Sequence, residues 1–246
     1  MLPAGTAAGY GFKMPRERFV IGVDGCRIGW IAVRLPARGS MQAEIIHAQR
    51  FSGLPLDRAE LAAVDMPIGL AEEGPRACDI AARRHLPRGR KSSVFPPPRR
   101  YMLAASSWAE ANEMGKRREA TGLPIESWAI TPKIREIDHW IAPTDQDRIR
   151  ETHPEVAFHR MNDQTLLPPK RGADGRAARL RLLQAGGLDA LETLLQRRPS
   201  GVQADDVLDA ACCALVARRM LDGDGLQLPG TRPPQDARGL RMEIWC

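Results

Sequence analysis

The residues best placed to do chemistry are aspartates that follow short apolar segments. Asp24 comes directly after the β-branched run 19–23, and Asp65 comes directly after the apolar run 61–64. Open α/β sheets place their ligands just beyond the carboxyl ends of the strands. We therefore predict that both carboxylates lie at one functional site. The alternative is that each aspartate caps its own turn.

A second acidic group lies at the start of an alanine-rich helical pattern at 205–221. Asp206 and Asp209 are three residues apart and share one helical face, whereas Asp205 and Asp209 are four apart, so spacing alone leaves the choice open. Favourable interaction with the helix dipole explains acids in the first turn. It does not explain Asp209, which borders the apolar stripe, where a bare carboxylate is unfavourable unless it is paired or bound to metal.

Four carboxylates and no softer ligands favour a hard divalent cation, so we predict Mg²⁺ or Mn²⁺ as the cofactor. Asp24, Asp65 and Asp209 are the expected metal ligands, and Asp206 is expected to be a further ligand or a base that orients water. Two such ions about 4 Å apart activate a water and stabilise the leaving oxygen in phosphodiester cleavage. Metal-dependent hydrolysis is the chemistry that this set of residues predicts.

The composition is that of an ordinary globular protein. The chain has 246 residues, of which 43% are hydrophobic and 27% charged, enough for one large domain or two small ones. No apolar run approaches the roughly 20 residues that span a bilayer, and the first residues lack the apolar core of a secretory signal. We expect Met1 to Arg18 to be a flexible extension and the protein to be cytoplasmic. The five cysteines form no C-x-x-C pair, so a zinc site is not indicated.

The net charge of +6 is rich in arginine. Guanidinium groups bind phosphate oxygens in a forked geometry, so this charge is compatible with nucleic acid as a partner. Genome composition and solubility also enrich arginine, and charge alone leaves the two explanations open.

The hydrophobic pattern predicts an α/β protein with a mixed five-stranded sheet flanked by helices. The expected strands are 19–23, 30–33, 43–48, 61–64 and a fifth around Val156 to His159. A mostly helical insertion at about 71–148 follows the fourth strand, and helices are expected at 174–185, 188–197 and 205–221. We expect residues 19–246 to form a single domain.

Six segments carry a family resemblance. In chain order they are GVDGCRIGW, AVDMPIGL, CDIAARRHL with RKSSVFPPPR, KIREID, THPEVAF and DDVLDAACCALVAR. They resemble an uncharacterised bacterial domain-of-unknown-function family of predicted nucleases with a ribonuclease H-like fold, over most of Val20 to Arg219. The resemblance implies one acid at the end of the first strand, a second at the end of the fourth, and an acid pair on the last helix. That pair is similar to the D-x-x-D-A pattern of RuvC-type resolvases, which favours Asp206 over Asp205.

Several donors are candidates for binding substrate phosphate. Arg27 follows the first aspartate by three residues, and Arg90, Ser92 and Ser93 precede a proline run. Neighbouring donors of this kind suit phosphate oxygens. A basic surface exposed to solvent also explains the same residues. The family resemblance favours Arg90, Ser92 and Ser93 as phosphate-binding residues.

Two further segments add candidates. Lys133 is expected on a strand-to-helix segment, from which it reaches the site, and Lys170 is a weaker candidate of the same kind. Glu155 belongs to a His-Pro-Glu triplet that the family shares. It is expected to be a fifth metal ligand, or to orient His153 or Arg27.

Three functions are consistent with these residues. The leading hypothesis is a divalent-metal-dependent nuclease that hydrolyses phosphodiester bonds. The second is a nucleotide-binding phosphotransferase or ATPase of the actin-like superfamily, because GVDGCRIGW loosely resembles its phosphate-binding turn; against it, those enzymes clamp a nucleotide between two copies of the fold. The third is a non-catalytic binding module that keeps the fold, with the proline-rich insertion blocking long polymers from the cleft.

Overall fold

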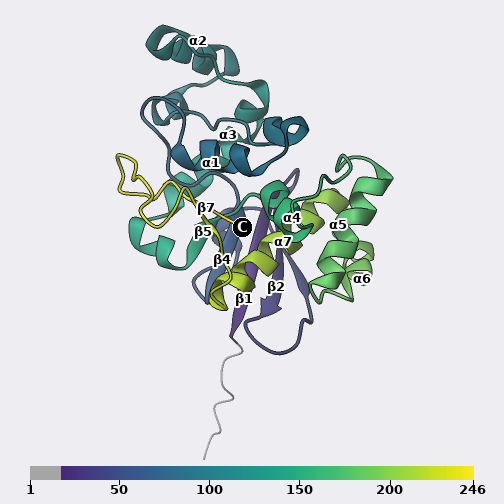
Figure 1. Cartoon of the computed structure of the whole chain (residues 1–246). Coiled ribbons are helices and arrows are strands. Elements are labelled where there is room, and N and C mark those ends of the chain that lie inside the picture. Colours follow the sequence, from purple (N-terminus) through teal and green to yellow (C-terminus); the bar gives the residue numbers. More distant parts are fainter. Residues whose placement is uncertain (1–17) are drawn as a thin grey trace, which may run out of the picture.

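A computed structural model describes residues 18–246 (Figure 1). The predicted extension, Met1 to Arg18, lies outside the described residues except for Arg18. No helix within the described range is long and apolar enough to cross a membrane.

A mixed five-stranded sheet forms the centre, in the order β3-β2-β1-β4-β5. The first three strands pair in antiparallel fashion, and β4 is parallel to both β1 and β5. The strands are β1 (Phe19–Cys26), β2 (Gly29–Pro36), β3 (Glu44–Ala48), β4 (Leu61–Asp65) and β5 (Ile149–Glu151). Two short strands, β6 (Gln227–Leu228) and β7 (Ile244–Trp245), pair separately. The predicted α/β class and five-stranded mixed sheet are confirmed.

The predicted position of the fifth strand is wrong. Residues 156–159 lie in helix α4 (Pro154–Met161), and the strand precedes them. Pro154 occupies the first position of this helix. A backbone N–H at that position has no partner within a helix, so its absence in proline costs no hydrogen bond. Val156, Ala157 and Phe158 are buried one after another. A short run of buried apolar residues is expected both in a buried helix and in a strand that is covered on both faces. The hydrophobic period therefore could not distinguish a helix from a strand here.

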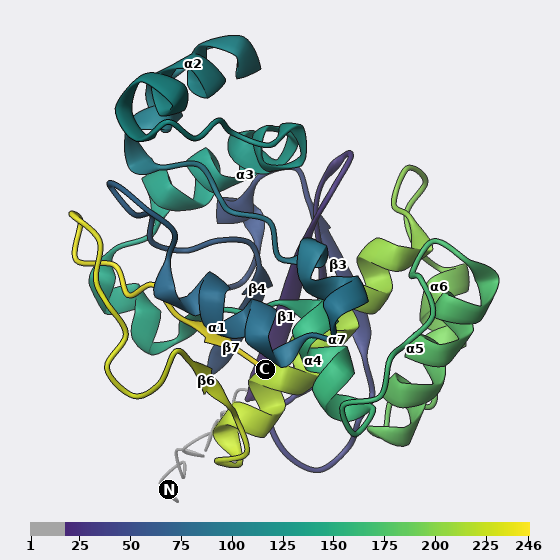
Figure 2. The ribbon, with the colours of Figure 1, turned by 45° about the horizontal axis from the view of Figure 1, so that its top comes forward.

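Helices cover both faces of the sheet. One core packs β1, β2 and β4 against α7, α4, α5, α6 and α1, and a second core packs the opposite face against α3 and the short helix η1. Figures 1 and 2 both place α5 and α6 side by side, away from α2. The helices are α1 (Ala77–His85), α2 (Trp108–Glu119), α3 (Ile125–Trp140), α4, α5 (Ala173–Ala185), α6 (Leu191–Gln196) and α7 (Ala204–Leu221). The 3₁₀ helices are η1 (Phe51–Gly53), η2 (Arg88–Ser93), η3 (Arg100–Ala104) and η4 (Pro143–Asp147).

Between β4 and β5 the described chain forms only helices and loops, as expected for residues 71–148. Its outer part, with α2, has a small apolar cluster of its own. The expected strand-to-helix segment around Lys133 is wrong, because α3 runs unbroken through Pro132. Ile134 and Ile137 are buried in the core from this helix, and we attribute the tolerance of the proline to that packing. The division of the chain into an extension and a single domain stays a prediction.

The backbone of α7 lies directly against β1 at Gly22. A Cβ atom at this glycine would overlap the amide nitrogen of Ala214 and the carbonyl oxygen of Ala210. Residues 207–217 of α7 are all buried. This contact brings the first turns of α7 to the ends of β1 and β4.

We predict that Gly22→Ala destabilises the fold by about 3 kcal/mol or more, at the upper end of overpacking costs, because backbone atoms of two elements would have to separate. Urea denaturation measures this change. Gly89→Ala is the matched control, since nothing lies within 4 Å of a Cβ atom there. Equal stability of the two variants would contradict the close packing.

Candidate metal centre

Asp24 and Asp65 are neighbours because of the strand register. They are paired residues of the parallel strands β1 and β4. Side chains alternate between the two faces of a strand, and Val20 packs into the core on the α7 face whereas Val23 packs into the opposite core. By this alternation both aspartates fall on the α7 face, at the carboxyl ends of their strands. The two carboxylates therefore lie close together, as expected, and their role at a functional site stays a prediction.

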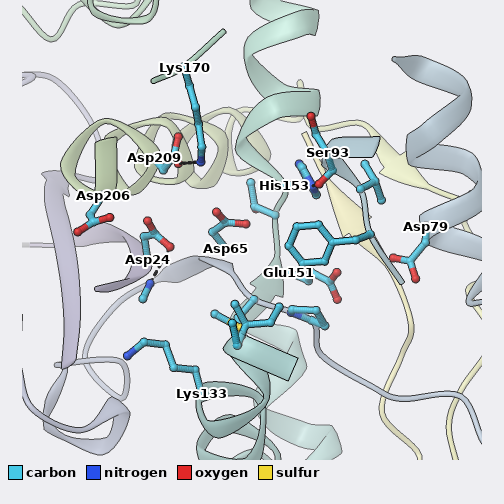
Figure 3. A pocket seen from close by; sticks show the side chains of 18 of the residues that line it. Asp24, Asp65, Asp79, Ser93, Lys133, Glu151, His153, Lys170, Asp206 and Asp209 are labelled. Carbon is cyan, nitrogen blue, oxygen red and sulfur yellow. Dashed lines mark hydrogen bonds and ion pairs between the residues drawn. The ribbon is translucent and has the colours of Figure 1, made fainter. Parts of the chain in front are cut away.

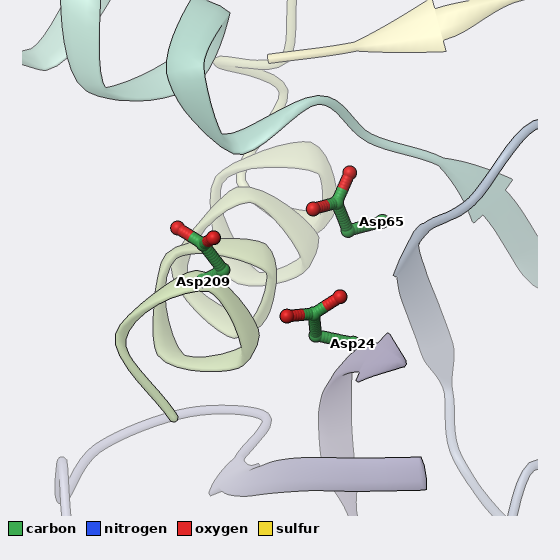
Figure 4. A group of neighbouring side chains, drawn as sticks. All are labelled: Asp24, Asp65 and Asp209. Atoms are coloured by element: carbon green, nitrogen blue, oxygen red, sulfur yellow. The ribbon is translucent and has the colours of Figure 1, made fainter. Parts of the chain in front are cut away.

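Asp209 approaches the same point from α7. Single carboxylate oxygens of Asp24, Asp65 and Asp209 lie within 4.8 Å of one another, and Figure 4 shows the three side chains directed into one space. Asp24 is 9% exposed and Asp209 4%. Three segments far apart in the sequence thus bring three nearly buried acids together.

Burial and mutual repulsion make these acids hard to ionise. Burial is the largest cause that raises the pKa of Asp24 well above its usual value, followed by the charges of Asp65 and Asp209. Burial and then Asp209 raise the pKa of Asp65 to about 8. The pKa of Asp209 is also raised, again mainly by burial. A divalent cation would offset both causes at once, so the residues present fit a metal ion.

Lys170 is the nearby cation. Its ammonium nitrogen lies 3.0 Å from Oδ2 of Asp209 (Figure 3), and its charge lowers the pKa of all three aspartates. The lysine side chain is 51% exposed, so solvent weakens its influence. When the three carboxylates are ionised, one lysine leaves two negative charges, which equals the charge of one divalent ion.

Asp206 lies beside the three acids and also caps the N-terminus of α7. Its carboxylate accepts a hydrogen bond from the backbone N–H of Gln203 at 2.9 Å and so caps the start of α7. It also lines the cavity that contains the three acids, whereas Asp205 is not among the lining residues. Burial is the main cause that raises the pKa of Asp206. Of the two candidates, Asp206 is thus the one that lines the cavity, and its role as a ligand or base stays a prediction.

The cavity has a volume of about 300 Å³. Of the donors predicted to bind substrate, Lys133 and Ser93 line it (Figure 3). Lys133 donates a hydrogen bond to the carbonyl of Gly29 and lies 4.6 Å from the ring centroid of Trp30. A Cβ atom at Gly25 would overlap the aliphatic part of the Lys133 side chain, so only a glycine at this position leaves room for the lysine.

The other predicted site residues lie outside the cavity lining. Arg27 and Ser92 are exposed, and Arg90 donates to the carbonyl of Leu167 at 2.6 Å. Glu155 pairs with Arg179 at 2.6 Å. None of these four candidates lines the cavity that contains the three acids, and their roles in binding or catalysis stay predictions.

Sequence reasoning missed a buried ion-pair cluster at the other end of the cavity. Arg76 is 2% exposed, and its Nη2 lies 2.6 Å from Asp79 and 2.7 Å from Glu151. It also donates to the carbonyls of Ile68 and Gly69, in the loop that follows Asp65. The cluster fixes this loop against β5. Arg76 and Glu151 fall outside the six family segments, so no signal in one sequence pointed to them.

The fold and site define an α/β protein with a buried carboxylate cluster that is compatible with a divalent metal. The family model described as "Protein of unknown function (DUF429)" matches residues 22–233, and the chain belongs to this family. No curated protein and no solved structure matches the chain. The expectation of a domain-of-unknown-function family is confirmed.

The raised pKa of Asp65 predicts a pH dependence in the metal-free protein. Between pH 4 and 8 the folded chain keeps a proton that the unfolded chain releases, so the free energy of unfolding falls as pH rises. Asp65→Asn removes this contribution. In the presence of a chelator we expect its stability relative to the wild type to increase from pH 5 to pH 8 by at least about 1.4 kcal/mol, the equivalent of one pKa unit.

Urea denaturation at the two pH values measures the difference, with Asp205→Asn as the control that lies outside the cluster. A relative stability of Asp65→Asn that does not change with pH would show that neither burial nor the neighbouring acids raise the pKa of Asp65 in the folded protein.

Proposed function

We propose that this protein hydrolyses phosphodiester bonds of nucleic acid, using Mg²⁺ or Mn²⁺ held by Asp24, Asp65 and Asp209. The observation that carries the proposal is the meeting of these three carboxylates, from β1, β4 and α7, within 4.8 Å of one another. Oxygen-only ligand sets select hard divalent cations. An arginine-rich chain with a net charge of +6 is suited to a polyanionic substrate.

A bound divalent cation lowers the pKa of water and stabilises the charge that develops on the leaving oxygen. The chain supplies the remaining functions. Lys133 and Lys170 lie on opposite sides of the acids (Figure 3), where their ammonium groups attract phosphate oxygens. Asp206 lies at the side of the acid group, and its raised pKa makes it a better proton acceptor for a water than an ordinary aspartate.

The ribonuclease H-like assignment is part of this proposal. It is supported by the order of the six family segments along the chain and by the sheet, in which three antiparallel strands are followed by a crossover to two parallel ones. It is also supported by the position of the acids, two at adjacent strand ends and one on the helix that packs across them. Fold alone does not define a reaction, so activity has to be measured.

The test is hydrolysis of single-stranded, duplex, hybrid and branched nucleic acids with Mn²⁺ or Mg²⁺. We expect Asp24→Asn and Asp209→Asn each to lower the rate of hydrolysis by at least about 100-fold. Loss of a residue that only orients a metal ligand lowers activity by up to about 100-fold, and loss of the ligand itself is expected to cost at least as much. Asp205→Asn, on the same helix but outside the cavity lining, is the matched control and is expected to keep its activity.

Hydrolysis that persists in Asp24→Asn would refute the proposal. A wild-type protein that binds Mn²⁺ but cleaves none of these substrates would favour the non-catalytic binding module instead.

A further inference from the structure

The cavity has two unlike sides. One side carries the three acids and Asp206, from the strand ends and α7. The apolar residues of the lining are the segment 94–95 after η2, Ala129 and Ile130 of α3, and Met66 and Pro67, and we call them the apolar side. The charged cluster of Arg76, Asp79 and Glu151 also lines the cavity. Figure 3 shows Lys133, also from α3, across the cavity from Asp209. The apolar side comes largely from the segment between β4 and β5.

The three acids lie in a cavity and are largely covered by the surrounding chain. Asp24 and Asp209 keep no more than 9% of their surface exposed. A cavity of about 300 Å³ is at the lower end of pockets for small molecules, which range over roughly 300–1,000 Å³. A phosphate in the middle of a long chain would have to enter together with both of its neighbours, whereas the end of a chain brings one unit.

The two sides match the two halves of a nucleotide. Carboxylates with a cation, flanked by Lys133 and Lys170, suit a phosphate group. Phe95, Ile130 and Met66 offer the apolar surface that a base requires, and Phe95 provides an aromatic ring in the cavity lining for stacking. Both requirements are met inside one cavity.

We propose that this cavity takes a single nucleotide unit at a free end of a nucleic-acid strand, with its phosphate at the acids and its base against Phe95. The inference rests on the proposed nuclease function and specifies its substrate. Each turnover consumes one water: the P–O bond to the adjacent nucleotide breaks and a P–O bond to the water oxygen forms. One water proton ends on the leaving hydroxyl, and the other stays with the new phosphate. The products are mononucleotides.

The experiment compares a linear single strand with a covalently closed circle of the same sequence, each prepared as DNA and as RNA, with Mn²⁺ and the full-length protein. A dinucleotide is included as a small diester. We expect mononucleotides from the linear strand, cleavage of the dinucleotide, and circles that stay intact. Circles opened at a rate within about tenfold of the linear rate would overturn the inference while the proposed function stands. Failure to cleave any substrate would overturn both.

A second measurement tests the place of the base. Linear strands that end in a normal nucleotide are compared with strands that end in an abasic unit. The wild type is expected to show a KM roughly tenfold lower for the normal end, and Phe95→Ala is expected to remove this preference with little change in kcat. Phe95→Leu, which keeps apolar volume without a ring, controls for loss of packing and is expected to restore part of the preference. A preference unchanged in Phe95→Ala would overturn the placement of the base.

Discussion

The contact of the α7 backbone with β1 at Gly22 is the constraint on which the site depends. It leaves no room for a side chain between helix and strand. It therefore brings Asp209 to the ends of the parallel strands β1 and β4, whose register already pairs Asp24 with Asp65. The fold thus places three carboxylates where burial disfavours their charged forms, and a bound cation, as we propose, would stabilise those forms.

The contrast with the second acidic cluster of the same cavity strengthens this argument. There, Asp79 and Glu151 share the guanidinium of Arg76, which is as buried as they are and is hydrogen-bonded to both. That cluster contains its own cation and holds a loop in place. In the group of three acids, one member, Asp209, is bonded to the half-exposed ammonium of Lys170. When all carboxylates are ionised, the Arg76 cluster keeps one negative charge, whereas the three acids with Lys170 keep two.

The sequence revealed the parts of the site that follow from local patterns. An acid after an apolar run and two acids three residues apart on a helix are short-range signals, and they identified Asp24, Asp65 and Asp209. The fifth strand was misplaced because the buried run 156–158 lacks a distinguishing period. Arg76 and Glu151 were missed because they are 75 residues apart and meet only through the tertiary fold. Long-range pairs of this kind leave no trace in the spacing of a single sequence.

The central claim is that the three carboxylates form a site for a divalent cation. The most direct measurement is an anomalous difference map from a crystal soaked in Mn²⁺. The account predicts a strong peak between the carboxylates of Asp24, Asp65 and Asp209, with the ammonium of Lys170 displaced or sharing the site. A map without a peak at this position, with Lys170 still bonded to Asp209 at saturating Mn²⁺, would contradict it.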